Sequence, residues 1–408
     1  MNRKLISMIL LMVSCCAGPG LAEAAGRSTV TFRDTDNRDR IYYFARGNND
    51  HLVVNYWDGF AWQWADQGLP PGATAISHPS AITYKDTAGQ QRIYVFSYSD
   101  IGSERNLVVN YWDGSRWQWA NQGGDLEGTE EPTAVTYTDG YRRTYVFARR
   151  NDGHLAVNYW NGLAWVWADH GLPPGAVGVF PLDAVTYPDD DQRIYVFGKA
   201  VGPAFPNPRL VVNHRDGNGW HWTVLNAAGG GDVQEASAIT YFDESLGHQR
   251  IYVFSTGGFS ANSLWVTHWD GSWHFKDLGQ PSQQSVRGPL SAISSVDENG
   301  IRRLQVFVSP LTHLVYEDCC VTGLYLWYTD SLGAHWSARG LPEPQWSGSL
   351  TPYVQKLDAI AYRSRSGSQW FHAFTLLDVS YGNYYLVRHY WGGAPVSLPS
   401  WAGQGPLP

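Results

Sequence analysis

Two short segments of this chain place an arginine, an aspartate and a histidine close together, each directly before an aromatic run. A pyranose sugar presents a ring of hydroxyls and an apolar C–H face. A sugar site therefore needs guanidinium, carboxylate or imidazole groups beside an aromatic side chain. A third segment between these two adds a tyrosine and an arginine. The predicted ligand-binding residues are Arg46, Asp50, His51, Tyr98, Arg105, Arg149, Asp152 and His154.

The elements that carry these residues belong to a repeat. A phrase that reads LVVNYWDG begins at Leu52 and Leu107, a close variant begins at Leu155, and degenerate copies begin at Leu210, Leu264 and Leu386. Each copy follows a run like IYVF, which itself follows a run like AITY. The IYVF-like and AITY-like runs occur seven times in constant order, which indicates an array of small β units.

Each unit predicts four strands. The first two runs are short, β-branched and apolar, as in strands buried on both sheet faces. The third and fourth are aromatic, and Asp-Gly or Asn-Gly supplies the tight reversal between them. The sequence therefore predicts an all-β fold, a seven-bladed β-propeller with four antiparallel strands per blade. The repeats span approximately 28–72, 80–124, 133–175, 183–231, 237–280, 291–344 and 358–405, within a single propeller domain over 25–408.

The two faces of such a disc differ in sequence. Connections between strands two and three, and those from strand four to the next blade, emerge on one face, which we call the loop face. The segments between strands two and three, such as 98–105 and 199–208, are long and variable. Binding residues concentrate on loops held by a rigid scaffold, so we expect the loop face to be functional. Loop shaping alone also explains polar residues there.

The opposite face, which we call the turn face, carries an acidic series in the first turn of the units. It includes Asp36, Asp86, Asp139 and Asp243. Aspartate is a favoured turn residue, and a ring of turns disperses the oxygens that calcium needs at one place. No metal site is predicted.

Residues repeated in every blade are expected to build the blades. We interpret the repeated tryptophans as packing between blades, the in-strand asparagines as buried amides, and the arginines that open strand two as packed side chains. The tryptophans are Trp62, Trp117, Trp165, Trp220, Trp273 and Trp336, the first asparagine is Asn55, and the first arginine is Arg40.

Composition excludes several partners. Of the 408 residues, 16% are charged and 14% aromatic, the net charge is −8, and no basic run is present. A nucleic-acid partner is therefore not expected. The sequence contains no Gly-x-Ser-x-Gly elbow, His-Glu-x-x-His motif or phosphate-binding glycine loop, so no cofactor is predicted.

Residues 1–24 are predicted to be a signal peptide, with a basic start, a short apolar stretch and a small-x-small cleavage site at Ala22-Glu23-Ala24. The protein is expected to be secreted. Alternatively, Met12 to Cys15 approximates a lipoprotein box, which would anchor the chain to a bacterial envelope through Cys15. No other apolar run is long enough for a membrane span.

Two adjacent cysteines, Cys319 and Cys320, lie in the longest insertion. They could form a vicinal disulfide, stay as thiols, or pair between chains. A zinc site would need more ligands at a different spacing.

The repeats resemble those of a known lectin family. The pattern Phe-Ala-Arg, followed by aspartate and His-Leu, occurs at 44–52 and 147–155, and an aromatic strand and a Gly-x-x-Trp turn follow it. It is similar to the repeats of seven-bladed bacterial lectins of the Photorhabdus type and, more loosely, to fungal fucose lectins and tectonins. The resemblance covers all seven units and implies sugar binding. Fucose-lectin pockets of that wider group combine an arginine, a glutamate and an aromatic ring between blades, whereas the central strands here contain no glutamate.

The function predicted from the sequence is a secreted, multivalent, non-catalytic lectin whose partners are glycans or glycoconjugates, with homo-oligomer formation left open. Two alternatives remain. One is a protein-binding scaffold that uses the loop face. The other is a glycoside hydrolase that uses two of the loop-face carboxylates, Asp100, Glu104, Glu317, Asp318 and Asp378.

Overall fold

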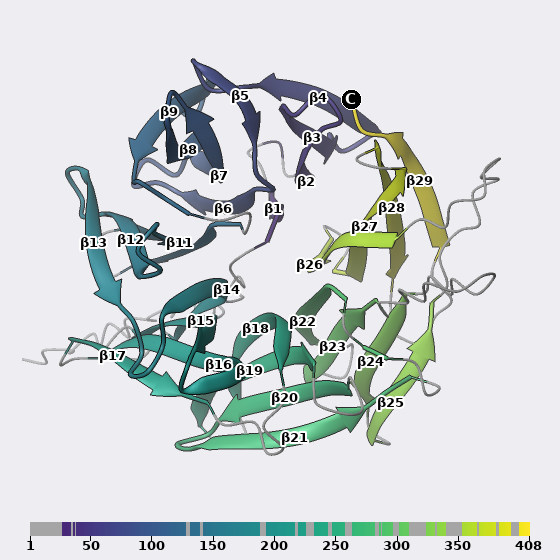
Figure 1. Cartoon of the computed structure of the whole chain (residues 1–408). Helices are drawn as coiled ribbons and strands as arrows, with labels where there is room; N and C mark the ends of the chain where they lie inside the picture. The colour runs from purple at the N-terminus through teal and green to yellow at the C-terminus, as the bar shows by residue number, and fades with distance from the viewer. Residues whose placement is uncertain are drawn as a thin grey trace, which may run out of the picture.

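The computed structural model confirms the predicted fold. Seven sheets, each a meander of antiparallel strands, form a ring, and the described residues contain strands and turns but no helix (Figure 1). The structure describes residues 27–408 apart from 34–35, 37, 128–130, 139–141, 188–192, 217–218, 226–231, 244–246, 258–262, 282–284, 287, 297–301, 310–323, 331–332, 340–352, 365–366, 381–382 and 393–399.

The strands of blades 1, 3 and 4 follow one another outward from the axis, whereas in blade 2 the short β5 and the inner strand β6 both pair with β7. Blade 1 has β1 (Thr29–Arg33), β2 (Asp39–Arg46), β3 (Leu52–Trp57) and β4 (Trp62–Gly68). Blade 2 has β5 (Ala73–Ile76), β6 (Ser80–Lys85), β7 (Gln91–Ile101), β8 (Glu104–Trp112) and β9 (Trp117–Gly123). Blade 3 has β10 (Thr133–Thr138), β11 (Arg142–Arg149), β12 (Leu155–Trp160) and β13 (Trp165–Gly171). Blade 4 has β14 (Gly178–Tyr187), β15 (Arg193–Gly202), β16 (Phe205–Asp216) and β17 (Gly219–Val224).

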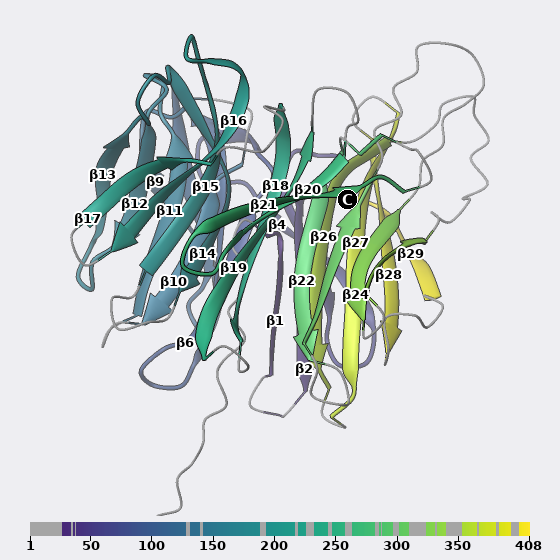
Figure 2. The same ribbon diagram turned by 90° about the horizontal axis from the view of Figure 1, so that it is seen from below.

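The remaining three blades repeat the order. Blade 5 has β18 (Val233–Asp243), β19 (His248–Gly257), β20 (Ser263–Trp269) and β21 (Trp273–Gly279). Blade 6 has β22 (Leu290–Val296), β23 (Arg302–Val308), β24 (Tyr325–Asp330) and β25 (Gly333–Ala338). Blade 7 has β26 (Tyr353–Arg363), β27 (Gln369–Ser380), β28 (Asn383–Gly392) and β29 (Ser400–Pro406). Figure 2 shows the disc from its side, with the strands running between its two faces.

Residues at the start of each inner strand link neighbouring blades. In each case the serine or aspartate of one inner strand accepts a hydrogen bond from the backbone N–H of an alanine on the inner strand of the next blade. The pairs are Ala134 to Ser80 Oγ (3.2 Å), Ala238 to Asp183 Oδ2 (2.7 Å) and Ala359 to Ser291 Oγ (3.0 Å). These bonds satisfy buried polar groups around the axis and hold the inner strands in register.

The interpretation of the repeated tryptophans as packing is confirmed. Trp117 packs edge-on against Phe44 of the preceding blade, with ring centroids 5.9 Å apart, and Trp165 contacts Phe96 in the same way at 5.8 Å. One assignment was wrong. Trp336 lies opposite Trp327 in blade 6, as Trp64 lies opposite Asn55 in blade 1, so it corresponds to Trp64 and not to Trp62.

The in-strand asparagines are buried amides, as predicted. Asn55 is 1% exposed, and its Nδ2 donates to the carbonyl oxygen of Gln63 at 3.3 Å. The arginine at the start of strand two is also packed, since Arg40 donates to the carbonyl oxygen of Asp58.

Two of the expected loops are strands. β7 and β8 continue their ladder to Ile101 and Glu104, and β15 and β16 continue to Gly202 and Phe205. Pairing satisfies the backbone groups that an irregular loop would leave to water. Gly102, at φ +67°, supplies the left-handed position that so tight a reversal needs.

Some predictions lie outside the described residues. These are the signal peptide, Cys15, Cys319, Cys320, Glu317 and Asp318. A search of the described residues for a helix with the length and hydropathy to span a bilayer finds none.

Candidate functional site

The predicted residues of blade 1 lie at the end of β2 and in the loop after it. Arg46 Nε donates to Asp50 Oδ1 at 2.8 Å, and the Asp50 carbonyl oxygen accepts from Ile76 of blade 2 at 3.2 Å. Beside this pair, the ring of His78 packs edge-on against Tyr384 of blade 7, with centroids 5.9 Å apart. Burial lowers the pKa of His78 to about 4, so its imidazole is neutral. Sequence reasoning missed His78 and Tyr384, which no repeat marks.

The matching loop of blade 3 corrects the equivalence of the two aspartates. Asp50 has φ +65° and Gly153 has φ +83°, so these two residues occupy the same left-handed position. The residue before each accepts a bond from the following histidine N–H at 3.1 Å, Asn49 from His51 and Asp152 from His154. Asp152 therefore corresponds to Asn49, and not to Asp50.

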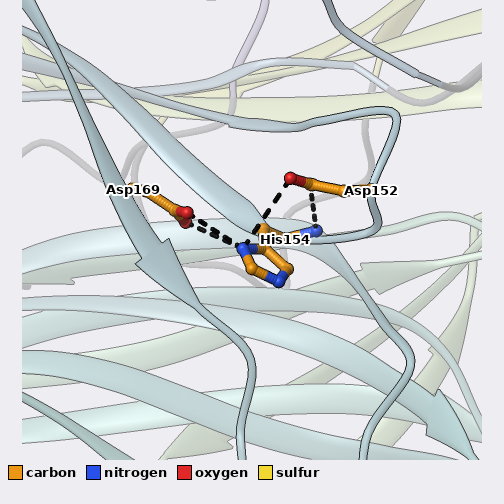
Figure 3. Close-up of side chains that lie close together, drawn as sticks. All are labelled: Asp152, His154 and Asp169. Atoms are coloured by element: carbon orange, nitrogen blue, oxygen red, sulfur yellow. Dashed lines mark hydrogen bonds and ion pairs between the residues drawn. The ribbon is translucent and has the colours of Figure 1, made fainter.

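His51 and His154 close a bulge at the outer edge of their blades. His154 Nδ1 lies 3.0 Å from Asp169 Oδ2, and Asp169 Oδ1 accepts the N–H of Gly171 at 2.8 Å (Figure 3). His51 and Asp66 repeat this arrangement, at 2.9 Å. Partial burial of Asp169 acts to raise its pKa, but the hydrogen bonds from His154 and Gly171 outweigh it and lower the pKa below 3.8. The Asp169 carboxylate therefore holds the end of β13 in place through its contacts with His154 and Gly171.

Asp152, His154 and Asp169 also form the group in the described residues whose ligand atoms could hold a metal ion, all within 4.8 Å of one another. His154 and the N–H of Gly171 already occupy the Asp169 carboxylate, and blade 1 has Asn49 in the place of Asp152. A strand-fastening role accounts for the geometry without an ion.

Arg149 lies between blades 3 and 4. Its guanidinium carbon stands 4.0 Å from the ring centroid of Phe180, its Nη2 lies 3.1 Å from Glu127 Oε2, and Lys199 Nζ is 5.3 Å from the same ring centroid. An arginine, a glutamate and an aromatic ring thus meet between blades. Sequence reasoning missed Glu127 because it lies outside the central strands, in the segment that leads into blade 3.

The predicted residues of blade 2 do not join either group. Tyr98 is 2% exposed and packs in the core between blades 2 and 3. Arg105 Nε donates to Asp100 Oδ1 at 2.8 Å across the β7–β8 hairpin. The eight residues therefore occupy separate places on three blades and do not form a single pocket.

A hollow lies on the turn face between blades 1 and 2, where no ligand site was predicted. This cleft 1/2 has a volume of about 690 Å³. It is lined by Phe32, Arg33, Arg40, Tyr42, Val54, Tyr56, Ala65, Gln67, Lys85, Gly89, Gln90, Gln91, Ile93, Trp112, Gly114 and Trp117.

The strand registers explain the aromatic walls of cleft 1/2. Tyr42 lies opposite Tyr56 in the β2–β3 ladder, and the rings of Phe32, Tyr42 and Tyr56 stack across three strands at 5.7 and 5.6 Å. Such cross-strand pairs stabilise a sheet. From blade 2, Trp112 and Trp117 form the facing pair at 5.8 Å.

Polar groups surround these rings. Arg40, Gln67, Lys85 and Gln90 offer guanidinium, amide and ammonium groups at the cleft. At its lip, Gly114 has φ +105°, and a Cβ there would lie 2.9 Å from Gln90 Oε1, so the Asp-Gly turn keeps the entrance free of a side chain. The sequence shows the repeated tyrosines Tyr42 and Tyr56 of one wall, but not which residues of the next blade face them.

Comparison with known proteins yields neither a family model nor a curated protein that matches the chain, so the resemblance to Photorhabdus-type lectins remains a prediction. Among solved structures, the lectin of Aleuria aurantia bound to Fucα1-6GlcNAc is 16% identical, with a TM-score of 0.49 over 78% of this chain and 97% of the lectin. The protein AofleA of Arthrobotrys oligospora is 13% identical, with a TM-score of 0.49 over 79% of this chain and 87% of its own.

An intramolecular trans-sialidase from Ruminococcus gnavus is 10% identical, with a TM-score of 0.42 over 92% of this chain and 95% of the enzyme. At these identities and scores, no ligand or binding residue is carried over from these proteins.

Proposed function

We propose that this protein binds glycans in clefts between its blades, without catalysis. The observation that carries the proposal is cleft 1/2, whose volume of about 690 Å³ lies within the range of roughly 300–1,000 Å³ typical of ligand pockets. Aromatic walls with a few amide and cationic donors suit a ligand that is apolar on its ring carbons and polar at its hydroxyls.

Charge argues for binding and against hydrolysis. The lining residues of cleft 1/2 include arginines, a lysine and glutamines, and no carboxylate. Glycoside hydrolysis generally needs two carboxylates on either side of the scissile bond. A hydrolase would therefore have to work elsewhere on the ring.

The surface also argues against a protein-binding scaffold. The large apolar side chains exposed among the described residues are Phe60, Leu163 and Val177, which lie on three different blades. Singly exposed apolar residues are normal, whereas a docking surface presents a contiguous patch.

The loop face is the second candidate location for the glycan. There the predicted ligands Arg46, Arg149, Arg105, His51 and His154 already pair with carboxylates. Such pairs contribute only about 0–1 kcal/mol at an exposed surface, so a sugar could compete with them. We prefer cleft 1/2 because its polar groups surround an existing hollow.

Export and multivalency complete the proposal. The signal-like residues 1–24 support secretion, with anchoring through Cys15 as the alternative. A disc with more than one weak site would gain avidity on a glycan-coated surface.

A glycan array with matched variants tests the proposal. Tyr56→Ala combined with Tyr111→Ala, its counterpart in blade 2, should reduce array binding at least about tenfold. Tyr159→Ala, at the same position in blade 3, should not. Chelator should leave binding intact, since the cleft lining holds no carboxylate for a cation.

Each alternative gives a different result. Loss of binding in the variant with both Arg46→Ala and Arg149→Ala, with the tyrosine variant unaffected, would move the site to the loop face. A blank array with capture of one protein partner would favour the scaffold. Cleavage of the glycan would favour the hydrolase.

A further inference from the structure

We infer that the cleft between blades 2 and 3, cleft 2/3, is a second copy of the glycan site, and that arginine side chains fill the corresponding clefts 3/4 and 7/1. This inference rests on the proposed function. It assigns two adjacent sites to the turn face of the ring.

Cleft 2/3 repeats the walls of cleft 1/2. Tyr84, Tyr94 and Tyr111 stack across three strands at 5.8 and 5.6 Å, and Tyr94 lies opposite Tyr111 as Tyr42 lies opposite Tyr56. The facing pair, Trp160 and Trp165, lies at 5.9 Å. The three tyrosines are half-buried, like Phe32, Tyr42 and Tyr56.

The polar groups are also repeated. Arg92 and Gln122 of blade 2 stand where Arg40 and Gln67 stand in blade 1, and Gly162 of blade 3 repeats the lip residue Gly114, with φ +102° against +105°. Arg142 takes the place of Gln91, and its guanidinium carbon lies 4.9 Å from the ring centroid of Tyr84. Lys85 stands in the place of Arg33, and Thr138 in the place that Lys85 has in cleft 1/2. Cleft 2/3 thus has as many cations as cleft 1/2, with Arg142 added and one lysine position lost.

Cleft 3/4 keeps the aromatic stack but loses the opening. Tyr137, Tyr145 and Tyr159 stack at 5.6 and 5.5 Å. Arg215 lies opposite Ile194, where Trp112 lies opposite Ile93 in blade 2, so it replaces the tryptophan of the facing pair. Its Nη1 donates to the Tyr137 hydroxyl at 2.8 Å.

Burial confirms that Arg215 covers the stack. Tyr137 is 9% exposed and Tyr145 6%, whereas Tyr84 and Tyr94 remain half-buried. His170 also replaces Gln67 and Gln122 here, and its ring lies 4.2 Å from that of Trp220. A sugar entering this cleft would have to displace both side chains.

In cleft 7/1, between blades 7 and 1, the side chain of Arg388 on β28 occupies the space beside the aromatic rings. Arg388 lies opposite Phe374, as Val54 lies opposite Phe44, so an arginine stands in the place of a valine that lines cleft 1/2. Its guanidinium carbon lies 4.4 Å from the ring centroid of Trp62 and 4.3 Å from that of Tyr390. Arg388 is 9% exposed, so its side chain packs against these rings and not in solvent.

The other three clefts lack part of the set. In cleft 4/5, Tyr195 is 4% exposed and His214 stands in the place of Tyr56. In cleft 5/6, Thr329 and Ala334 stand in the places of the two tryptophans, and in cleft 6/7 Gln305 replaces the middle ring of the stack. Clefts 1/2 and 2/3 therefore combine the stack, the tryptophan pair and partial exposure.

Binding stoichiometry tests the inference. The probe is a soluble form of the array glycan with the strongest signal, titrated calorimetrically into the full chain. Wild type should bind two molecules per chain, and Tyr56→Ala and Tyr111→Ala should each bind one. Arg215→Trp, alone or with His170→Gln, should bind three, because the tryptophan restores the facing pair and frees Tyr137.

The outcomes separate this inference from the proposed function. Absence of any glycan binding contradicts the proposed function itself. Binding of one molecule by wild type, or an unchanged stoichiometry in Tyr111→Ala, overturns the second site while the function stands. Binding of more than two molecules by wild type overturns the claim that arginines fill clefts 3/4 and 7/1. If Arg215→Trp fails to fold, as judged by its circular dichroism, Arg215→Tyr, which also restores an aromatic ring to the facing pair, takes its place; a folded variant that still binds two molecules overturns the role of Arg215.

Discussion

Asp183 is a carboxyl group buried near the axis of the ring, and its surroundings change its pKa. It is 3% exposed on β14, at a position that serine occupies in blades 2, 5 and 6, as Ser80, Ser237 and Ser291. Burial raises its pKa to about 7, although the positive charge of Arg27 and the N–H groups of Ala238 and Ala184 oppose the rise. The folded chain therefore binds a proton here more tightly than the unfolded chain.

Asp183→Ser should remove a pH dependence of stability. Because the folded pKa of about 7 exceeds the ordinary 3.8, this carboxyl favours the fold below pH 4 and loses that contribution as the pH rises through 7. The slope is at most about 1.4 kcal/mol per pH unit. Thermal unfolding at pH 4.5 and pH 8 should show the variant gaining on wild type at the higher pH. Ser80→Ala, which cannot titrate, should differ from wild type equally at both.

Residue roles could be predicted where a position repeats and is buried. Asn55 and Trp117 were read as structural because they recur in every early blade, and both pack as expected. Cleft 1/2 could not be predicted in this way. It depends on which side chains of two blades face each other, and that relation is absent from either repeat alone.

At the scale of single elements, the outer strands β4 and β13 end at a β-bulge that an aspartate side chain stabilises. Asp66 and Asp169 accept the N–H of Gly68 and Gly171 and also contact a histidine, whereas Asn121 of blade 2 accepts the N–H of Gly123 at 2.8 Å without one. Blade 2 therefore shows that an asparagine at this position can accept the glycine N–H without a histidine contact.

Asp169→Ala should destabilise the protein by about 1 kcal/mol, because the Gly171 N–H loses its partner at a partly exposed site. Asp169→Asn should cost less than half of that, since the amide oxygen can accept as Asn121 does. Midpoints of urea unfolding measure both. Equal losses would mean that the His154 contact, and not the backbone bond, carries the stability, and stabilisation of wild type by added zinc would point to a metal role for this cluster.

The strands themselves were predictable, but their ends were not. The β-branched apolar runs and the aromatic runs predicted the central ladders, which the registers confirm. The segment 98–105, into which β7 and β8 extend, was predicted to be a loop because it is long and varies between the units. Tyr98 and Ser99 are buried there, whereas Asp100, Gly102, Ser103 and Glu104 are exposed, and strand pairing satisfies the backbone groups of the exposed tip.

At the scale of the whole molecule, the ring closes without a shared strand. β1 to β4 and β26 to β29 form separate sheets, so blades 7 and 1 are joined by contacts between the two sheets, which include a backbone bond from the N–H of Asn48 to the carbonyl oxygen of Pro408 at 2.9 Å. Asn48 Nδ2 donates to the Leu407 carbonyl oxygen at 2.7 Å, and its Oδ1 accepts the N–H of Tyr384 at 2.7 Å. Thr29 Oγ1 donates to Asp358 Oδ2 at 2.5 Å near the axis.

Asn48→Ala should therefore weaken the closure. It removes two hydrogen bonds across the joint, and we expect a loss of about 1–3 kcal/mol. Asn151→Ala, at the same loop position of blade 3, removes a bond to the exposed Asp125 and should cost less. Thermal unfolding compares the two variants, and equal shifts would show that Asn48 does not hold the ring closed.

The central claim is that glycans bind in the clefts of the turn face. A crystal structure of the chain with the glycan that binds most strongly on the array tests it most directly. The account predicts sugar beside Tyr56 and Trp112 in cleft 1/2 and beside Tyr111 and Trp160 in cleft 2/3. Sugar on the loop face at Arg46 or Arg149, with both clefts empty at saturating glycan, would contradict it.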